Sequence, residues 1–391
     1  MPVTPSRADT LSAVESRPRL LVATTDFPPS RGGIQRVLEE LTRRLADRWR
    51  ITVIAPRQDA SADYDDGAPF QIIRTRAGWH DSRTAVFREM TQLIARRRFE
   101  LLLAGHMNTL PAALLAGRGA PSMALVYGSE LWAPRTRPLT RLLGSRLDRA
   151  MAISRFTAAE AASAGIPRNQ IVITPLGAEP PPPAEAPATN AALGALGLMS
   201  AGRVSPFFVT VSRLTEPHKG HDVFLRALPI VLRRHPDARY VIAGEGPMSH
   251  ELRALSRDLG VEHAVLFAGG IDEPTREVLM ASCRAFVMPS RESRRPPLFE
   301  GFGLVFIEAA MAGRPSLAGA SGGIPDAVVD GETGVLVDPR SVAEVAEGAL
   351  RLLDEPAYAD ALGARARERA LSGYTWDIAI ARMERCMEAM L

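Results

Sequence analysis

The chain has 391 residues, 46% of them hydrophobic and 23% charged, and a formal net charge of +3 at pH 7, so it is too apolar for a disordered chain and long enough for two domains. Only two cysteines occur, which excludes a disulfide framework or a multi-cysteine zinc site and favours a reducing, cytoplasmic setting. No apolar run reaches the roughly 18 residues that span a bilayer, and without RNA-binding aromatics or zinc-finger spacings no nucleic acid partner is expected.

Residues 1–18 are polar and lack an apolar core, so they are expected to form a disordered tail rather than a secretory signal. From residue 19 to residue 180, short apolar runs of β character alternate with amphipathic helical patterns such as 34–48. This alternation predicts a parallel sheet covered by helices on both faces, as in a Rossmann-like domain. The expected strands are 19–25, 51–56, 71–76, 100–106, 122–127, 150–154 and 171–175.

Four consecutive prolines at 180–183 cannot join a sheet ladder, and they predict a semi-rigid linker over 181–203. A second Rossmann-like domain is expected over 204–374, followed by an amphipathic helix over 375–391 that crosses back to the first domain. Its expected strands are 207–213, 239–243, 264–268, 285–289, 316–319 and 334–337, and its helices include 222–234, 249–259, 274–282 and 341–353. Because open α/β sheets bind ligands beyond their strands' carboxyl ends, two facing domains predict a cleft suited to two substrates.

The strongest chemical signal is the segment 299–308, where Glu300 and Glu308 stand eight residues apart with glycines after the first. It follows an expected strand and leads into a helix that starts near Gly303. The free amides and positive dipole end of such a helix suit a diphosphate, and Glu308 can accept both hydroxyls of a ribose. The alternative is that Glu300 belongs to a turn and Glu308 to a solvated helix face.

Lys219 is the only lysine among 47 basic residues. Together with Arg213 it lies in the loop beyond the expected strand 207–213, at the same sheet edge as Glu300. Two cations near a helix N-terminus can neutralise a departing diphosphate without a metal ion. A surface arginine and lysine in a solvated loop are the alternative.

These segments, taken together and in order, resemble the family-four retaining glycosyltransferases of the GT-B fold. The resemblance runs from about residue 20 to the end of the chain. It is carried by the segments 211–220, Gly244-Glu245-Gly246-Pro247, 299–308 and 321–326. It implies a nucleoside-diphosphate sugar donor in the second domain, no metal or other cofactor, and catalytic roles for Arg213, Lys219 and Glu300. The donor-binding residues that it implies are Gly32, Gly33, Gly269, Gly301, Phe302, Gly303, Leu304 and Glu308.

The segment 25–34 resembles one branch of this family, the GDP-mannose-dependent mannosyltransferases that act on phosphatidylinositol or on exopolysaccharide precursors. The resemblance implies that Gly32 and Gly33 let a loop cover the donor phosphates, although a glycine pair between a strand and a helix also serves as simple turn chemistry. The segment Gly105-His106-Met107-Asn108 resembles the same branch and implies that His106 lies on the acceptor and sugar side.

One segment departs from the family pattern. Where many relatives carry a histidine in a His-Gly-x-Glu segment, this chain has Tyr127-Gly128-Ser129-Glu130. Either Tyr127 or Ser129 is expected to support the donor sugar in place of the imidazole, or the acceptor differs. A short Asp63-Tyr64-Asp65 string resembles the metal-binding string of other glycosyltransferases, but it lies in an expected polar loop without a second acidic cluster.

The resulting hypothesis is a retaining hexosyltransferase that moves mannose from GDP-mannose to a hydroxyl acceptor. Residues 1–180 carry 25 arginines against 17 acidic residues, which favours a lipid-linked acceptor and peripheral contact with an anionic inner membrane, or else a solvated arginine-rich surface. Three alternatives remain open: a nucleotide-sugar 2-epimerase of the same fold, a non-catalytic subunit that binds sugar nucleotides, and a membrane adaptor.

Overall fold

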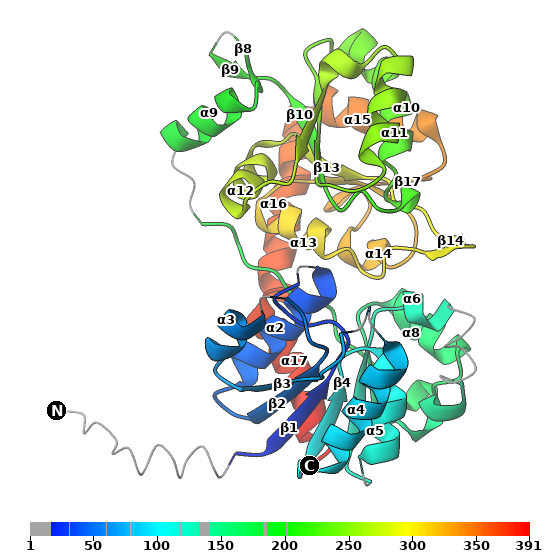
Figure 1. The fold of residues 1–391 in the computed structure, drawn as a ribbon. Coiled ribbons are helices and arrows are strands. Elements are labelled where there is room, and N and C mark those ends of the chain that lie inside the picture. Colours follow the sequence, from blue (N-terminus) through cyan, green and yellow to red (C-terminus); the bar gives the residue numbers. More distant parts are fainter. Residues whose placement is uncertain are drawn as a thin grey trace, which may run out of the picture. The chain divides into compact units, whose positions relative to one another are not determined.

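The computed structural model describes residues 17–30, 32–59, 61–78, 80, 82–117, 119–132, 141–182, 186–200 and 202–391 (Figure 1). All but two residues of the expected tail 1–18 lie outside this description. The chain divides into two compact units: Met1–Leu176 with Trp376–Leu391, and Gly177–Thr375. Each unit is built around its own parallel sheet.

The first unit holds seven parallel strands in the order β3-β2-β1-β4-β5-β6-β7. These strands are β1 (Arg19–Ala23), β2 (Arg50–Ala55), β3 (Gln71–Arg74), β4 (Leu101–Ala104), β5 (Ser122–Val126), β6 (Arg149–Ala152) and β7 (Ile171–Ile173). The helices are α2 (Gly33–Leu45), α3 (Ser61–Asp66), α4 (Arg83–Ala95), α5 (Leu110–Ala116), α6 (Ser129–Trp132), α8 (Arg155–Ser163) and α17 (Trp376–Glu388). Short 3-10 helices occur at η1 (Met107–Thr109), η2 (Gly144–Arg146) and η3 (Arg168–Gln170).

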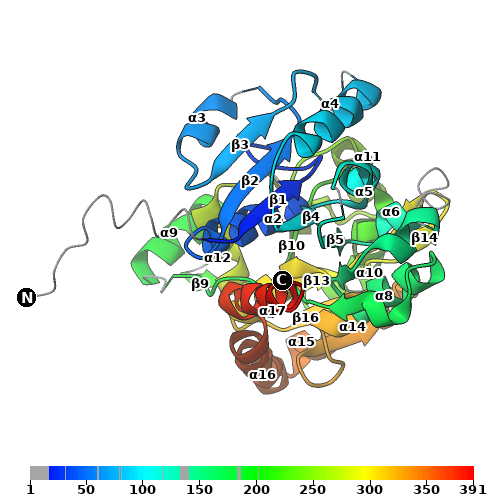
Figure 2. The same ribbon diagram turned by 90° about the horizontal axis from the view of Figure 1, so that it is seen from below.

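Helices cover both faces of this sheet (Figure 2). Successive side chains of a strand point to opposite faces, and Leu21 and Ala23 of β1 pack in one cluster with buried side chains of α4 and α5. Helix α2 buries Val37, Leu38, Leu41 and Leu45, which recur at helical spacing along its inner side. Helix α17 packs against α2, where the Trp49 indole donates a hydrogen bond to Glu384 at 3.1 Å.

The second unit holds six parallel strands in the order β12-β11-β10-β13-β16-β17. These strands are β10 (Phe207–Val211), β11 (Arg239–Ala243), β12 (Val265–Gly269), β13 (Ala285–Met288), β16 (Ser316–Gly319) and β17 (Gly334–Val337). Two small hairpins pair β8 (Met199–Ser200) with β9 (Arg203–Val204) and β14 (Ser293–Arg294) with β15 (Pro297–Leu298). The helices are α9 (Ala186–Ala195), η4 (Pro217–Lys219), α10 (His221–Arg234), α11 (Ser249–Asp258), η5 (Glu262–Ala264), α12 (Glu273–Ser282), α13 (Leu304–Met311), α14 (Ile324–Ala327), α15 (Val342–Asp354) and α16 (Pro356–Gly373).

The expected fold class is confirmed, because both units are doubly wound α/β domains with parallel sheets. The stretch 181–203, predicted as a linker, differs in the structure. It contains helix α9 and the first strand of the β8–β9 hairpin, and it belongs to the second unit. Residues 180–182 lie outside helix and strand, whereas the alanine-rich sequence 186–195 has high helix propensity and forms a helix that packs against α12.

Both sheets have the same topological switch point. The strand order reverses between β1 and β4 in the first unit and between β10 and β13 in the second. Ligands of open α/β sheets bind beyond the carboxyl ends of the strands at such a point. The segments that follow these four strands are therefore the places where each unit can bind a ligand.

Candidate active site

In the second unit, the loop after β10 carries Arg213 and Lys219. Lys219 ends the short helix η4, and Gly220 follows with a φ of +81°, in the left-handed region that favours glycine. A Cβ atom on Gly220 would overlap the carbonyl oxygen of Pro289, just past the end of β13. Glycine therefore lets this turn lie directly against β13, on the other side of the switch point.

Lys219 and Glu300 meet at this switch point. The Lys219 ammonium forms an ion pair with the Glu300 carboxylate, and the two side chains are only 20% and 18% exposed. The guanidinium of Arg213 is exposed and forms no ion pair with any residue that the structure describes. One cation is thus held by a carboxylate, whereas the other is exposed and available to an anion.

A glycine loop supports the backbone that carries Arg213. Gly244 and Gly246 have φ angles of +145° and +152°, and a Cβ on either would overlap a carbonyl oxygen of the Arg213 loop, at Ser212 or Leu214. The Leu214 amide also donates to the Glu245 carbonyl at 2.8 Å. The Gly-Glu-Gly segment after β11 therefore packs backbone to backbone against the loop that presents Arg213.

A buried histidine fixes the start of α10 beneath the same loop. The His221 ring lies within hydrogen-bond distance of Ser212 Oγ at 2.9 Å and of the Tyr240 hydroxyl at 3.0 Å. Burial lowers the pKa of His221 to about 4, because the charged imidazolium is disfavoured away from water. The ring is therefore neutral at pH 7, with one nitrogen as donor and the other as acceptor.

His218 precedes Lys219 and is also buried. Burial first, and the neighbouring positive charge of Lys219 second, lower its pKa to about 4. Its Nδ1 atom has no hydrogen-bond partner among the described residues. With both histidines neutral at pH 7, the positive charge in this loop comes from Lys219 and Arg213.

Glu300 lies four residues before helix α13, whose N-cap Gly303 has a φ of +84°. The N-cap residue is a glycine and has no side chain to cap the helix, so the amides of the first turn, which begins at Leu304, can bind an anion. The Phe302 ring beside it is buried and stacks on Tyr374 with a centroid distance of 5.9 Å. The donor-binding residues expected in this segment therefore surround one helix start.

The loop after β16 holds the backbone of Glu300. The Gly323 amide donates to the Glu300 carbonyl at 2.8 Å, and a Cβ on Gly322 would approach that oxygen to 2.5 Å. Since Gly322 also has a φ of +59°, glycine is required there on both counts. Gly301 lies in the same segment, directly after Glu300.

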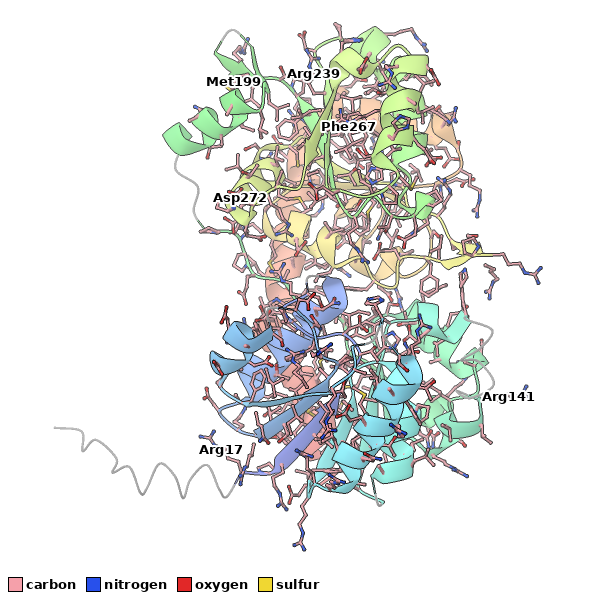
Figure 3. All side chains as sticks on the ribbon, viewed as in Figure 1. Arg17, Arg141, Met199, Arg239, Phe267 and Asp272 are labelled. Carbon is pink, nitrogen blue, oxygen red and sulfur yellow. The ribbon has the colours of Figure 1, made fainter. Side chains whose placement is uncertain are left out.

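Glu308 forms an ion pair with Arg276, a residue that the sequence analysis did not single out. Its carboxylate, on a side chain only 12% exposed, forms an ion pair with Arg276 of α12, which also pairs with Glu273. Helix α12 begins after Asp272, labelled in Figure 3, whose carboxylate accepts a hydrogen bond from Thr275 N at 3.0 Å. The Glu273–Arg276 spacing signals a pair within one helix, but nothing in the sequence points from Arg276 to Glu308.

The end of β12 lies against the same glycine loop. Gly269 is the last residue of β12 and has a φ of +66°. Its carbonyl accepts a hydrogen bond from Gly244 N at 2.7 Å, and Gly270 N donates to the Glu245 carboxylate at 3.2 Å. Gly269 therefore lies at the carboxyl edge of the sheet, where the expected contact with a base would occur.

In the first unit, Gly32 and Gly33 lie at the start of α2, after β1. Gly32 caps the helix with a φ of 168°, an extended conformation open to any residue, and a Cβ there would overlap only the flexible side chain of Gln35. A Cβ on Gly33 would meet nothing within 4 Å. The fold of the first unit does not itself require glycine at either position.

His106 and Tyr127 follow β4 and β5 and stack on each other, with ring centroids 6.2 Å apart. Nδ1 of the buried His106 accepts a hydrogen bond from Asn108 N at 3.1 Å. Burial, with the negative charges of Glu130 and Asp26, raises the pKa of Tyr127 well above its ordinary value, and its hydroxyl has no partner among the described residues.

The backbone of this tyrosine segment is fixed by a buried carboxylate. Glu130 accepts hydrogen bonds from Tyr127 N at 2.8 Å and Gly128 N at 2.9 Å. Ser129 begins helix α6, and its side chain lies outside the described residues. The Tyr-Gly-Ser-Glu segment is thus a tight turn that presents Tyr127 beside His106.

The Asp63-Tyr64-Asp65 string forms part of helix α3 and not the expected loop. The Asp65 carboxylate makes a two-point ion pair with Arg74, with distances of 3.0 and 2.7 Å. Across the ranges that the structure describes, no group of three or more His, Cys, Asp or Glu side chains could hold a metal ion. Of the helices in the described part of the chain, none is long and apolar enough to cross a bilayer.

Comparison with known proteins gives matches to both units. The family model described as Glycosyltransferase Family 4 matches residues 31–180, and the model described as Glycosyl transferases group 1 matches residues 203–369. A GDP-mannose-dependent alpha-(1-6)-phosphatidylinositol monomannoside mannosyltransferase of Mycobacterium tuberculosis is 35% identical over 378 residues, covering 93% of this chain and 97% of that protein.

A related enzyme of Corynebacterium glutamicum, named for the monoacylated form of the same acceptor, is 30% identical and covers 95% of this chain and 98% of its own length. Among solved structures, HepE of Anabaena in complex with UDP and glucose aligns with a TM-score of 0.79 at 18% identity, covering 95% of this chain and 100% of that one. At that identity the structural match establishes the fold alone. Because the sequence matches extend over nearly the whole chain, the protein belongs to the group 1, family 4 glycosyltransferases of the GT-B fold.

Proposed function

We propose that the protein is a mannosyltransferase that moves mannose from GDP-mannose to a hydroxyl of a lipid-linked acceptor, with retention at the anomeric carbon. The donor and the acceptor class come from relatives that are 30% and 35% identical over nearly the whole chain. The observation that carries the proposal for the site is the Lys219–Glu300 ion pair at the switch point of the second unit, just before helix α13.

The second unit supplies what a departing nucleoside diphosphate needs. Arg213 offers an exposed guanidinium that forms no ion pair among the described residues, Lys219 offers an ammonium, and α13 offers the amides of its first turn. Positive groups near the leaving diphosphate stabilise the charge that develops in the transition state. In the proposed reaction these groups bind the diphosphate and need no metal ion.

The two glutamates of the segment 299–308 bind the two sugars of the donor, its mannose and its ribose. Glu300 accepts hydrogen bonds from the hydroxyls of the mannose, and Glu308 from the hydroxyls of the ribose. Arg276 holds the Glu308 carboxylate in place through their ion pair. Gly269, at the end of β12, allows the base to approach the backbone closely.

The transfer step is a front-face displacement. The acceptor oxygen attacks the anomeric carbon on the side from which the diphosphate leaves, and the bond from that carbon to the phosphate oxygen breaks. The leaving phosphate oxygen takes the proton of the acceptor hydroxyl, so no separate base is needed. Arg213, Lys219 and the α13 amides stabilise the charge that develops on the leaving oxygen.

The first unit is proposed to bind the acceptor and the sugar side of the donor. The open space around Gly33 allows a donor phosphate to approach the start of α2. His106 and Tyr127 follow β4 and β5 and stack on each other, and this pair is proposed to support the sugar side of the donor. The arginine-rich first half supports a cytoplasmic protein with peripheral contact to an anionic membrane that holds the acceptor.

The test is transfer by the purified chain from a panel of GDP-, UDP-, ADP- and dTDP-sugars to phosphatidylinositol monomannoside in detergent, in the presence of EDTA. We expect mannose transfer from GDP-mannose, with an α-anomeric product by NMR. We expect Lys219→Ala to reduce the rate by about 100-fold or more, by analogy with loss of an oxyanion donor.

Arg257→Ala is the matched control, because Arg257 lies in the same unit, is 50% exposed and pairs only loosely with Glu262 at 3.8 Å. It should transfer like the unmodified protein. Isomerised sugar nucleotide released without acceptor would favour an epimerase, and nucleotide binding without any turnover would favour a binding subunit. Near-normal transfer by Lys219→Ala would reject the assigned site.

A further inference from the structure

A two-stranded hairpin lies in the second unit between the end of β13 and Glu300. Its strands β14 and β15 pair antiparallel, and Arg294 lies opposite Pro297, so Arg295 and Pro296 form the turn. Figure 1 shows β14 projecting from the rest of this unit. The hairpin connects the switch point to the candidate active site, but the proposed transfer step gives it no role.

The base of the hairpin is attached to the rest of the second unit. The Arg291 guanidinium makes a two-point ion pair with Asp222 in the first turn of α10, with distances of 2.9 and 3.1 Å. The Arg291 amide donates to the carbonyl of His218 at 2.8 Å, and the Arg340 guanidinium donates to the carbonyl of Glu292 at 3.0 Å. These contacts hold the hairpin beside the loop after β10, which carries the cations of the candidate site.

The turn of the hairpin carries exposed positive charge. Residues 291–298 include three arginines and one acidic residue, Glu292. Arg291 already has its carboxylate partner, whereas Arg294 and Arg295 are exposed. The Arg295 guanidinium forms no ion pair within the part of the chain that the structure describes. Positive charge therefore remains at the turn, where it is accessible to an anionic ligand.

The turn lies within reach of the reacting carbon of the donor. Arg295 stands five residues before Glu300, so their Cα atoms are at most about 17 Å apart, and the long arginine side chain can shorten that distance. In the proposed reaction Glu300 contacts the donor sugar, and the acceptor oxygen attacks this sugar on the side from which the diphosphate leaves. The acceptor must therefore lie near this segment of the second unit at the moment of transfer.

We propose that Arg294 and Arg295 bind the phosphodiester of the acceptor and so select acceptors that carry one. The inference rests on the proposed function, in which the acceptor is lipid-linked and phosphatidylinositol monomannoside is its test compound. The inositol ring of that compound carries the phosphodiester directly, so the phosphate enters the site together with the headgroup hydroxyls. A guanidinium donates two parallel hydrogen bonds to phosphate oxygens, which favours arginine for this contact.

The experiment measures mannose transfer from GDP-mannose to two soluble headgroups, glycerophosphoinositol mannoside and the inositol mannoside that lacks the phosphodiester. The purified full chain should have a KM about ten-fold lower for the first headgroup, because each exposed ion pair contributes up to about five-fold. Arg294→Gln combined with Arg295→Gln should raise this KM until the two headgroups are equal. The kcat and the affinity for GDP, measured by calorimetry, should stay unchanged.

The matched control is Arg233→Gln combined with Arg257→Gln, which removes the same charge from exposed arginines of the second unit. These residues lie near the C-terminal ends of α10 and α11. Helices that connect parallel strands run opposite to the strands, so these ends lie at the sheet edge away from the candidate site. The control should keep the preference of the unmodified chain, and an equal loss of preference there would refute the assignment to the hairpin.

A preference that the hairpin variant retains, or an equal rise of KM for both headgroups, would overturn the proposal. Weaker GDP binding by this variant would also contradict it, because the two arginines would then contact the donor. Failure of the proposed function gives a different result, since the unmodified chain itself would transfer mannose to neither headgroup. Calorimetric titration of glycerophosphoinositol mannoside into the GDP-bound chain needs no turnover, and equal affinities of the unmodified chain and the variant would reject the hairpin contact.

Discussion

Replacing Glu300 by glutamine should change nucleotide binding and sugar transfer in opposite directions. The Glu300 carboxylate forms an ion pair with the ammonium of Lys219. A diphosphate must therefore compete with that carboxylate for the lysine. The glutamine variant removes the competing charge and its repulsion of the diphosphate, but it also removes the charged acceptor for the donor sugar.

The size of each effect follows from the exposure of the pair. With 20% and 18% of the side chains exposed, the ion pair is partly screened by solvent, and breaking it costs about 1 kcal/mol. GDP should therefore bind to Glu300→Gln about five times more tightly than to the unmodified chain. A hydrogen bond to a charged group contributes roughly 1.5–3 kcal/mol and one to a neutral amide oxygen roughly 0.5–1.5 kcal/mol, so mannose transfer should fall by about five- to ten-fold.

Calorimetric titration with GDP and the initial rate of transfer from GDP-mannose measure the two effects on the same preparation. Glu262→Gln is the control, because Glu262 is 58% exposed and its partner Arg257 lies 3.8 Å away. It should change neither quantity. Weaker GDP binding by Glu300→Gln, or tighter binding with an unchanged rate, would refute the idea that Glu300 both holds Lys219 and contacts the sugar.

Three further predictions concern the frame of the site. Gly220→Ala should lower both the unfolding midpoint and the transfer rate, because the new Cβ would overlap the Pro289 carbonyl oxygen. The control Gly260→Ala, at a φ of +69° with no atom near the new Cβ, should lower the free energy of unfolding by only about 1 kcal/mol and leave transfer unchanged. Equal losses of stability and transfer in the two variants would contradict this. Glu308→Ala should bind GDP and 2′-deoxy-GDP equally by calorimetry, because it removes the oxygen atoms that accept the ribose hydroxyls. The unmodified chain should prefer GDP about ten-fold, and a preference retained in the variant would exclude that contact. The pKa of His221, about 4 in the folded chain, lies below the ordinary 6.5, so the unfolded chain binds more protons between these values and stability falls as the pH falls. Urea titrations should show this group removing about 2 kcal/mol between pH 7 and pH 5 and a smaller loss in His221→Gln; identical losses would contradict the buried neutral ring.

The sequence predicted the architecture because local patterns encode it. Strands buried on both faces are near-continuous apolar runs, and the expected strand 239–243 coincides with β11. Helix α10 begins one residue before its predicted start, where the left-handed Gly220 marks the boundary. The pattern does not predict helix α16, because its alanine- and arginine-rich sequence lacks a clear apolar stripe. It predicts a linker where α9 lies, because the preceding prolines disfavour regular structure.

The ordered motifs also predicted the family, which the comparisons confirm, whereas the roles of Arg213, Lys219, Glu300 and Glu308 stay predictions. The single lysine and the two glutamates eight residues apart can be identified from the sequence without a structure. Their placement at the carboxyl ends of parallel strands follows from the βα alternation alone, because all such ends lie at one edge of the sheet.

Only the tertiary structure decided which groups touch. Lys219 meets Glu300, 81 residues away, because β10 and β13 are neighbours at the switch point, and Arg276 meets Glu308 because α12 and α13 pack together. Burial likewise explains why the hydroxyls of Tyr127 and Thr174 lack hydrogen-bond partners among the residues that the structure describes. Strand order and burial depend on contacts between distant segments. A local sequence pattern does not show which distant side chain will form an ion pair or a hydrogen bond with a given residue, or whether any will.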